Sequence, residues 1–306
     1  MASLKNIKLK IHSYKKTGTV TRAMEAVSAV KMRKSQERAL SGRAYAAAAL
    51  TILEKLAGTQ TVIDMPLMQD RKGKSCFIVV TSDKGLAGSL NSGVIRRVER
   101  EIADRALDKK DVVIIGFGRR GADYFASRGY DVRIRHENVS DSIGESDIRE
   151  VVDGIFAWHT AKEIGSVLVG YQNFLSTFEQ EPTIRHIVPI TREVMRVMVA
   201  GIRPARGRYS PSVASAKEGA SVAYTIEPDP EKILAELLPK LLNIAVFHAL
   251  LEAKASEHSA RMVAMKNATD KAKEMVRLST RIYNKVRQAA ITREVSEIVG
   301  GIEAMR

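Results

Sequence analysis

Proline is absent from both ends of this chain of 306 residues. None precedes Pro66, and none occurs from Lys240 to Arg306. The C-terminal stretch also has no glycine as far as Val299, so it contains no residue that stops a helix. At ~1.5 Å per residue, about sixty helical residues would be roughly 90 Å long, which is too long to be buried in one globular core. The sequence therefore predicts two long terminal helices that each need a partner alongside.

The spacing of apolar and small residues indicates where that partner lies. In the C-terminal arm such residues recur at steps of four and three, which is typical of a coiled coil. The predicted seam consists of Leu251, Ala255, His258, Met262, Met265, Thr269, Ala272 and Val276. The N-terminal arm, residues 1–57, has a similar pattern, which we interpret as interrupted by a stutter near Gly18. Its predicted seam residues are Leu4, Ile7, Ile11, Tyr14, Val20, Met24 and Val27.

The middle of the chain has a different pattern. Short apolar segments alternate with helical ones, which predicts a mostly parallel sheet covered by helices. The predicted strands are Cys76–Thr81, Asp111–Gly116, Tyr130–Arg135, Ser166–Phe174 and Thr183–Ile190. We therefore expect a central Rossmann-like α/β domain at residues 75–200, followed by a flexible linker rich in glycine and proline at 201–221. A last strand, Val222–Ile226, and the C-terminal helix would make up residues 222–306.

The net charge of +14 is confined to the two arms. Residues 1–57 hold twelve Lys and Arg against three Asp and Glu, and residues 240–306 hold twelve against seven, whereas the middle holds equal numbers. This distribution fits a solvated helix surface, a nucleic-acid stripe or an acidic protein partner. No apolar run approaches the ~20 residues that span a membrane. The N-terminus lacks the apolar segment of a secretory signal, and a single cysteine, Cys76, permits no internal disulfide.

A glycine-rich turn raises the question of a dinucleotide site. Residues 116–121 match G-x-G-x-x-G between a predicted strand and a predicted helix, and Glu137 lies where an acid that binds ribose would be. The fingerprint normally opens the first strand–helix unit, however, and here a whole strand and helix precede it. Even where no ligand binds, a helix that packs closely over a sheet needs glycines in the turn that precedes it. We therefore predict a packing role for these glycines. Residues 83–88 form a second such turn, which lacks the G-K-[ST] of a P-loop.

No set of residues has the spacing of a catalytic or metal site. The histidines at positions 12, 136, 159, 186, 248 and 258 are not spaced as metal ligands. No G-x-S-x-G elbow occurs, and Cys76 lies in an apolar strand, where a thiol is usually inert. We therefore expect no catalytic residue, no cofactor and no metal in this chain.

Both arms contain short motifs. In the N-terminal arm they are residues 21–27 (TRAMEAV) and 31–34 (KMRK). In the C-terminal arm they are residues 256–265 (SEHSARMVAM), 283–292 (YNKVRQAAIT) and 297–301 (EIVGG). These motifs resemble those of the γ subunit of F-type ATP synthase. Residues 82–88 (SDKGLAG) resemble the family's first strand–helix loop, and Tyr224 with 227–230 (EPDP) resembles the segment before its last helix. The resemblance extends from one end of the chain to the other.

The resemblance implies a rotor shaft. The terminal helices would form an antiparallel coiled coil inside a ring of alternating α and β subunits, and the α/β domain would lie beside the ε subunit and the membrane c-ring. Proton flow through the c-ring would turn the shaft, which would drive the catalytic β subunits through their open and closed states. The chain would be present once per complex, peripheral on the cytoplasmic face of a bacterial plasma membrane, and would carry out no chemistry itself.

The matching motifs also imply two sets of partner-binding residues. The first set would couple the shaft to a β subunit in one region, with Arg287 and Gln288 on its acidic catch loop. This set consists of Arg22, Met24, Arg261, Arg287 and Gln288. The second set, Tyr224 and Glu227, would lie near the c-ring and the ε subunit. The last apolar residues would supply a face that slides against an apolar sleeve. They are Ile291, Val295, Ile298, Val299 and Ile302.

Two other interpretations remain open. A nucleotide-dependent enzyme would need the glycine turn at residues 116–121 to bind its cofactor. A nucleic-acid-binding coiled coil would need an affinity that falls steeply with salt. Few aromatic residues lie in the arms, so few side chains there could stack with bases.

Overall fold

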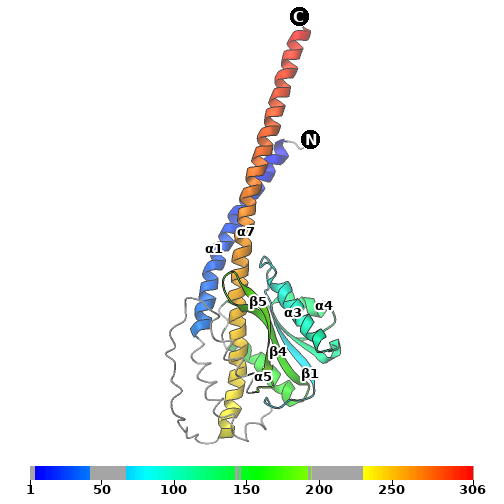
Figure 1. Ribbon diagram of the computed structural model, residues 1–306, viewed down its shortest axis with the longest axis vertical. Coiled ribbons are helices and arrows are strands. Elements are labelled where there is room, and N and C mark those ends of the chain that lie inside the picture. The colour runs from blue at the N-terminus through cyan, green and yellow to red at the C-terminus, as the bar shows by residue number, and fades with distance from the viewer. Residues whose placement is uncertain are drawn as a thin grey trace. The chain divides into compact units, whose positions relative to one another are not determined.

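The computed structural model describes residues 4–41, 67–141, 146–191 and 230–305, together with residues 144 and 194. The chain forms two compact units, which are Met1–Ala29 with Arg261–Arg306 and Val30–Ala260. Figure 1 shows their helices and strands. The rest of the predicted N-terminal arm, the linker at 201–221 and the strand Val222–Ile226 lie outside the described residues, and so do Tyr224 and Glu227.

Both predicted long helices are present. Helix α1 comprises Leu4–Ser41 and helix α7 comprises Pro230–Ala304 (Figure 1). Proline suits the first position of α7, because the amide of that residue has no acceptor within the helix. The helix continues through Pro239. Beyond it, no further proline and no glycine occur as far as Val299, which explains why the helix is so long.

The two helices run antiparallel in the unit formed by residues 1–29 and 261–306, here called the coiled-coil unit. Thr21 Oγ1 lies 2.7 Å from Thr269 Oγ1, and a Cβ atom placed on Gly18 would lie 3.4 Å from Cβ of Ala272. The pairing moves back along α1 as it moves forward along α7, which confirms the predicted antiparallel coil. Each hydroxyl also has a carbonyl acceptor one turn back on its own helix, Gly18 for Thr21 at 3.2 Å and Met265 for Thr269 at 2.8 Å, so either hydroxyl can be the donor between the two helices. A shifted register would break this buried bond.

The seam of α1 differs from the predicted one. Val20 and Val27 are 51% and 56% exposed, so the prediction that they face the other helix is wrong. The covered residues include Ile7, Ile11 and Tyr14, as predicted, and also Gly18, Thr21 and Ser28. Of these six, Ile7, Thr21 and Ser28 are buried and the others are partly buried. Their steps of four and three continue through Gly18, so the predicted stutter is also wrong. Small side chains in the seam let the helix backbones approach closely, which leaves the bulkier valines on the solvent side.

The predicted seam of α7 is divided between the two units. From Met262 onward it lies in the coiled-coil unit, where Met265, Thr269 and Ala272 are buried as predicted. The earlier seam residues belong to the other unit, where Leu251 is part of the core that covers the sheet. One heptad pattern therefore serves two different packing surfaces.

Replacing Gly18 with alanine is expected to stabilise the coiled-coil unit. Glycine inside a helix costs about 0.5–1 kcal/mol relative to alanine, and the added Cβ would make ordinary van der Waals contact with Ala272 at 3.4 Å. Thermal unfolding followed by far-UV circular dichroism should show a higher midpoint for Gly18→Ala. Gly18→Leu should lower it, because the larger side chain would push the helices apart. A lower midpoint for Gly18→Ala as well would contradict the close but unstrained approach.

The central sheet has five strands in the order β3-β2-β1-β4-β5. The strands are β1 (Lys74–Val80), β2 (Val112–Phe117), β3 (Asp131–His136), β4 (Ile164–Phe174) and β5 (Gln180–Val188). Strand β1 pairs in parallel with β2 and β4, β2 pairs in parallel with β3, and β5 is antiparallel to β4. The predicted mostly parallel sheet is thus confirmed. Nearly every residue of β1 and β2 is buried, as expected for strands covered on both faces.

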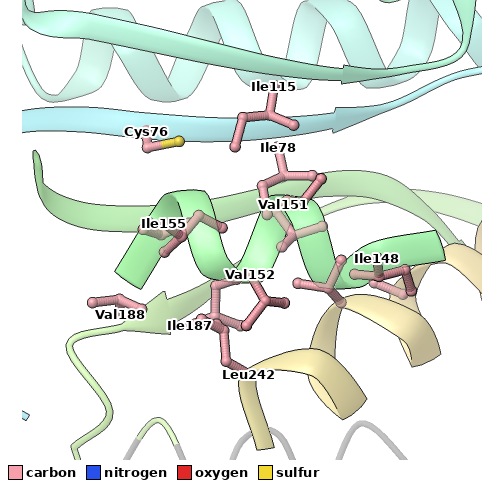
Figure 2. Packing of buried hydrophobic residues seen from close by; sticks show 14 of the residues in the cluster. Cys76, Ile78, Ile115, Ile148, Val151, Val152, Ile155, Ile187, Val188 and Leu242 are labelled. Carbon is pink, nitrogen blue, oxygen red and sulfur yellow. The ribbon is translucent and has the colours of Figure 1, made fainter. Parts of the chain in front are cut away.

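Helices cover both faces of the sheet. On one face, α3 (Leu90–Asp104) and α4 (Arg119–Ser127) pack on a core that includes Phe77 and Ile114. On the other face, α5 (Ser146–Thr160) and the first part of α7 enclose a larger core, to which Ile78, Ile155 and Leu242 belong (Figure 2). Successive residues of a strand point to opposite faces, so each strand contributes to both cores. A short 3-10 helix, η2 (Lys109–Asp111), precedes β2.

The buried histidine at the end of α5 should make the domain sensitive to acid. His159 is fully buried, and this burial lowers its pKa, with a further contribution from the Arg71 guanidinium. Below about pH 6.5 the unfolded chain therefore binds a proton that the folded chain does not, so stability should fall as the pH falls. We expect His159→Leu to lose less stability than the unmodified chain between about pH 7.5 and about pH 5.5, measured by urea unfolding. An equal loss in both proteins would rule His159 out as the cause.

Candidate partner-binding surface of the coiled coil

The glycine-rich turn between β2 and α4 is filled by packing contacts. Gly118 has a φ of +90°, and a Cβ atom there would lie 2.1 Å from the carbonyl oxygen of Thr81. A Cβ atom on Gly116 would lie 2.7 Å from Cβ of Ala122, and the Gly121 N–H donates to Thr81 Oγ1 at 2.9 Å. Each glycine of the G-x-G-x-x-G turn thus lets α4 return closely over β1 and β2, which is the packing role predicted from the sequence.

The N-terminus of α4, where the phosphates of a dinucleotide would bind, is capped by the chain itself. The Arg119 N–H donates to Asp83 Oδ1 at 3.0 Å, and the Arg120 N–H donates to the Ser82 carbonyl at 3.3 Å. A phosphate would have to displace the Asp83 carboxylate and would then be repelled by its charge. The geometry of this turn therefore disfavours a nucleotide site.

The other place for a ligand in an open α/β sheet is the point where the strand order reverses. Here that point lies between β1 and β4. Ala253, Lys254 and Glu257 of α7 lie over it and, with Thr81 and Gln172, line a cavity of about 10 Å³. Such a cavity has room for about one water molecule. The chain's own C-terminal helix thus takes the place that a substrate or cofactor takes in enzymes of this architecture.

Buried polar side chains fasten α7 to the sheet. The Tyr171 hydroxyl donates to Glu252 Oε2 at 2.8 Å, and Arg185 Nη2 lies 3.5 Å from the same oxygen. Burial raises the pKa of Tyr171, and the Glu252 carboxylate raises it further, so the hydroxyl stays protonated as the donor. The Ser256 hydroxyl donates to the Gln172 carbonyl at 2.9 Å. Removing one partner of such a set leaves a buried charge uncompensated, so this part of α7 is a fixed component of the domain.

The described residues offer little for catalysis. They include no group of three His, Cys, Asp or Glu side chains that could hold a metal ion. Burial raises the pKa of the Cys76 thiol to about 12, so this thiol stays protonated at neutral pH and is a poor nucleophile.

The exposed surface of the coiled-coil unit is strongly basic. Its exposed basic residues are Lys5, Lys8, Lys10, Lys15, Lys16, Arg22, Lys266, Lys271, Lys273, Arg277, Arg281, Lys285, Arg287 and Arg293. Some form ion pairs within one turn of α7, such as Lys271 with Glu274 at 2.8 Å. Exposed pairs of this kind contribute at most about 1 kcal/mol, so they are readily exchanged for pairs with another protein. The surface therefore suits a partner with exposed carboxylates.

Three of the predicted coupling residues lie at neighbouring levels of the coil. Arg22 is exposed and Met24 is partly buried, and both are within one turn of Thr21 on α1. Arg261 is partly buried on α7, eight residues before Thr269. Because Thr21 and Thr269 pair with each other, all three residues lie within about 12 Å of this pair along the helix axes, at ~1.5 Å per residue.

Arg287 and Gln288 lie elsewhere. Both are exposed, and Arg287 follows Arg261 by 26 residues of continuous helix, which is about 39 Å at ~1.5 Å per residue. The register of the coil puts Leu4, the first described residue of α1, opposite Val286. Arg287 and Gln288 are thus at the end of the described two-helix segment. The five predicted coupling residues therefore form two separate groups rather than one region.

The last turns of α7 carry an exposed apolar surface, as predicted. Its members are each more than half exposed and are Ile291, Val295, Ile298, Val299, Ile302 and Met305. Isolated exposed aliphatic residues are ordinary, but a continuous set marks a surface that another molecule covers.

Among the exposed apolar residues of the other unit are two in loops, Phe178 and Leu86, which no sequence pattern indicated. Phe178 is 80% exposed at the tip of the β4–β5 hairpin, which Ser259 of α7 holds by donating to the Thr177 carbonyl at 2.6 Å. Leu86 is exposed in the loop between β1 and α3 and has a φ of +64°. The only signal for either in the sequence is a large apolar residue inside a polar turn.

Comparisons with known proteins agree with this architecture. A sequence model of the family described as "ATP synthase" matches residues 3–305. The chain is 35% identical to the ATP synthase gamma chain of Heliobacterium modesticaldum over 306 residues, which is 100% of both chains. It is also 35% identical to the ATP synthase gamma chain of Pelotomaculum thermopropionicum, again over 100% of both chains.

Solved structures show the same fold. A chain of the Euglena gracilis mitochondrial ATP synthase, in a structure of OSCP, F1 and c-ring, has a TM-score of 0.63 at 17% identity, covering 99% of this chain and 94% of that one. A chain of the Tetrahymena thermophila mitochondrial ATP synthase, in a structure of the central stalk and c-ring, has a TM-score of 0.59 at 20% identity, covering 81% and 99%. A long antiparallel coil and an α/β domain are therefore the fold that this chain shares with these chains of ATP synthases. This chain belongs to the ATP synthase gamma chain family.

Proposed function

We propose that this chain is the rotor shaft that couples rotation of a membrane c-ring, driven by protons, to the conformational cycle of catalytic β subunits. The observation that carries the proposal is the end of α7, where a basic two-helix segment gives way to exposed apolar residues from Ile291 onward. A shaft that turns inside a ring needs such a tip, because apolar attraction has no preferred direction and resists sliding little. Charged contacts along the basic part of the shaft can break and form again at each rotational step.

The partners that fit this function are α and β subunits around the coiled coil, with the ε subunit and the c-ring beside the α/β domain. The basic surface would attract acidic loops of the β subunits. We assign contact with β subunits to both groups of coupling residues, one around Arg22, Met24 and Arg261 and one at Arg287 and Gln288. Tyr224 and Glu227 are assigned to the contact with the c-ring and the ε subunit.

One copy of the chain would serve each complex, and the complex would place it on the cytoplasmic face of a bacterial plasma membrane. None of the described helices is both long enough and apolar enough to span a bilayer. Attachment to the membrane would therefore come through the partner subunits, among them the c-ring.

Reconstitution with cognate α and β subunits tests the proposal. We expect the chain to elute in gel filtration with a hexamer of α and β subunits at one copy per hexamer, and ATP hydrolysis to depend on its presence. If α and β assemble and the chain remains free, the assignment of partners is wrong. Binding of NADH by the free chain would revive the nucleotide interpretation, and binding of DNA that weakens steeply with salt would revive the nucleic-acid interpretation.

A further inference from the structure

The loop that follows β3 receives basic side chains from both long helices. Within the unit formed by residues 30–260, Lys31 Nζ of α1 lies 2.6 Å from Asp141 Oδ2. His258 Nε2 of α7 lies 2.8 Å from the other carboxylate oxygen, Oδ1. The backbone of the loop also accepts hydrogen bonds, with Arg38 donating to the Asp141 carbonyl at 2.6 Å and Lys254 donating to the Val139 carbonyl at 2.9 Å.

The environment keeps Asp141 ionised. Its partial burial would raise its pKa, but the hydrogen bonds and charges of Lys31 and His258 outweigh this and lower the pKa to about 2. His258 is almost fully buried, whereas Lys31 remains about half exposed. The bond to α7 is therefore better shielded from water and salt than the bond to α1.

The two oxygens of one carboxylate thus hold one helix each. Helix α7 is also fastened to the sheet by Ser256 and by Glu252. Two side-chain bonds from α1 to the domain, from Lys31 and Arg38, end on Asp141. Any sliding or rotation of α1 against α7 would lengthen at least one bond to this residue.

We propose that Asp141 acts as a clasp that fixes α1 and α7 to the α/β domain, so that twist passes between the domain and both helices instead of through α7 alone. This positioning role rests on the proposed rotor function. Loss of the clasp would leave the helices intact and would make the connection between domain and helices softer to twisting.

The variants that test the clasp are Asp141→Ala, Asp141→Asn and Lys31→Met. Asp141→Ala removes the carboxylate contacts of both helices and keeps the backbone carbonyl that accepts from Arg38. Asp141→Asn keeps acceptor capacity without charge, and Lys31→Met releases only the carboxylate contact of α1. The control is Asp123→Asn, which breaks an exposed ion pair of the same domain, Arg135 with Asp123 at 2.8 Å.

In the assembled complex, torsional stiffness is measured from the angular fluctuation of a rod attached to the α/β domain while catalysis is paused. We expect the variance of the angle to rise at least twofold in Asp141→Ala, to rise less in the other two clasp variants, and to stay unchanged in Asp123→Asn. Hydrolysis without load should remain within twofold of the unmodified complex. If Asp141 only stabilises the fold, Asp141→Ala would lower the unfolding temperature without changing the variance of the angle.

A measurement on the isolated full-length chain separates this proposal from the proposed function. Amide hydrogen exchange in residues 30–38 of α1 should be faster in Asp141→Ala and Lys31→Met than in Asp123→Asn. Equal exchange and equal angular variance in the clasp variants and the control would overturn the proposal. If the unmodified chain fails to assemble with α and β subunits, the rotor function fails, and the exchange rates still decide whether Asp141 holds α1. Should Asp141→Ala not fold, Asp141→Asn and Lys31→Met carry the same comparison.

Discussion

Replacing Arg287 and Gln288 together with alanine is expected to lower ATP synthesis by the reconstituted complex at least tenfold, while the isolated chain stays folded. Both side chains are exposed on α7, and alanine is the best helix former, so the helix itself should not suffer. A charge-assisted hydrogen bond to a partner carboxylate contributes about 1.5–3 kcal/mol. A contact needed at the transition between β-subunit states would therefore change the rate about tenfold or more when it is lost.

The measurement is proton-driven ATP synthesis in membrane vesicles, together with circular dichroism of the isolated variant. Arg277→Ala is the matched control, because it removes one positive charge from another exposed position of the same helix. We expect this control to keep most of the activity. If the double variant synthesises ATP as fast as the control, Arg287 and Gln288 are not coupling residues. If both variants lose activity equally, the general basic charge matters and the particular side chains do not.

Replacing Gly118 with alanine is expected to destabilise the α/β domain by about 3 kcal/mol or more, because strain and overlap add. The backbone at this position has a φ of +90°, and the new Cβ would lie 2.1 Å from the Thr81 carbonyl oxygen. That oxygen belongs to backbone directly after β1, which is buried in the centre of the sheet, so it has little room to move. To relieve this overlap, α4 would have to shift away from β1 and β2.

Gly129→Ala separates the two causes. This glycine also has a positive φ, +79°, but a Cβ atom there would meet no other atom within 4 Å. Its substitution should cost only the conformational strain, about 1–2 kcal/mol. Urea unfolding of both variants gives the comparison. Equal losses of unfolding free energy would show that the close approach of Gly118 to Thr81 is not a constraint on the fold.

The candidate site was only partly predictable from the sequence. The basic surface and the apolar end of α7 follow from composition and helical spacing, since exposure on a long helix depends mainly on the residue types along it. The separation of Arg287 from Arg261 also follows once the helix is continuous. What no local pattern indicated is the convergence of Lys31 and His258 on Asp141. These residues are far apart in the chain, and Asp141 lies in a loop with no motif of its own.

The sequence by itself determined the elements of this protein. Arms without proline became long helices, and five apolar segments between helical ones became a mostly parallel sheet, because helix and strand formation depend on neighbours in the chain. The tertiary structure alone decided which faces meet. Thr21 and Ser28 are buried in α1, whereas Val20 and Val27 are exposed. The helical period does not tell which face is buried, because every face of a helix repeats with the same period. The buried face is decided by how closely the partner helix can approach. The same holds for α7, where one repeating pattern packs against α1 in one unit and against the sheet in the other.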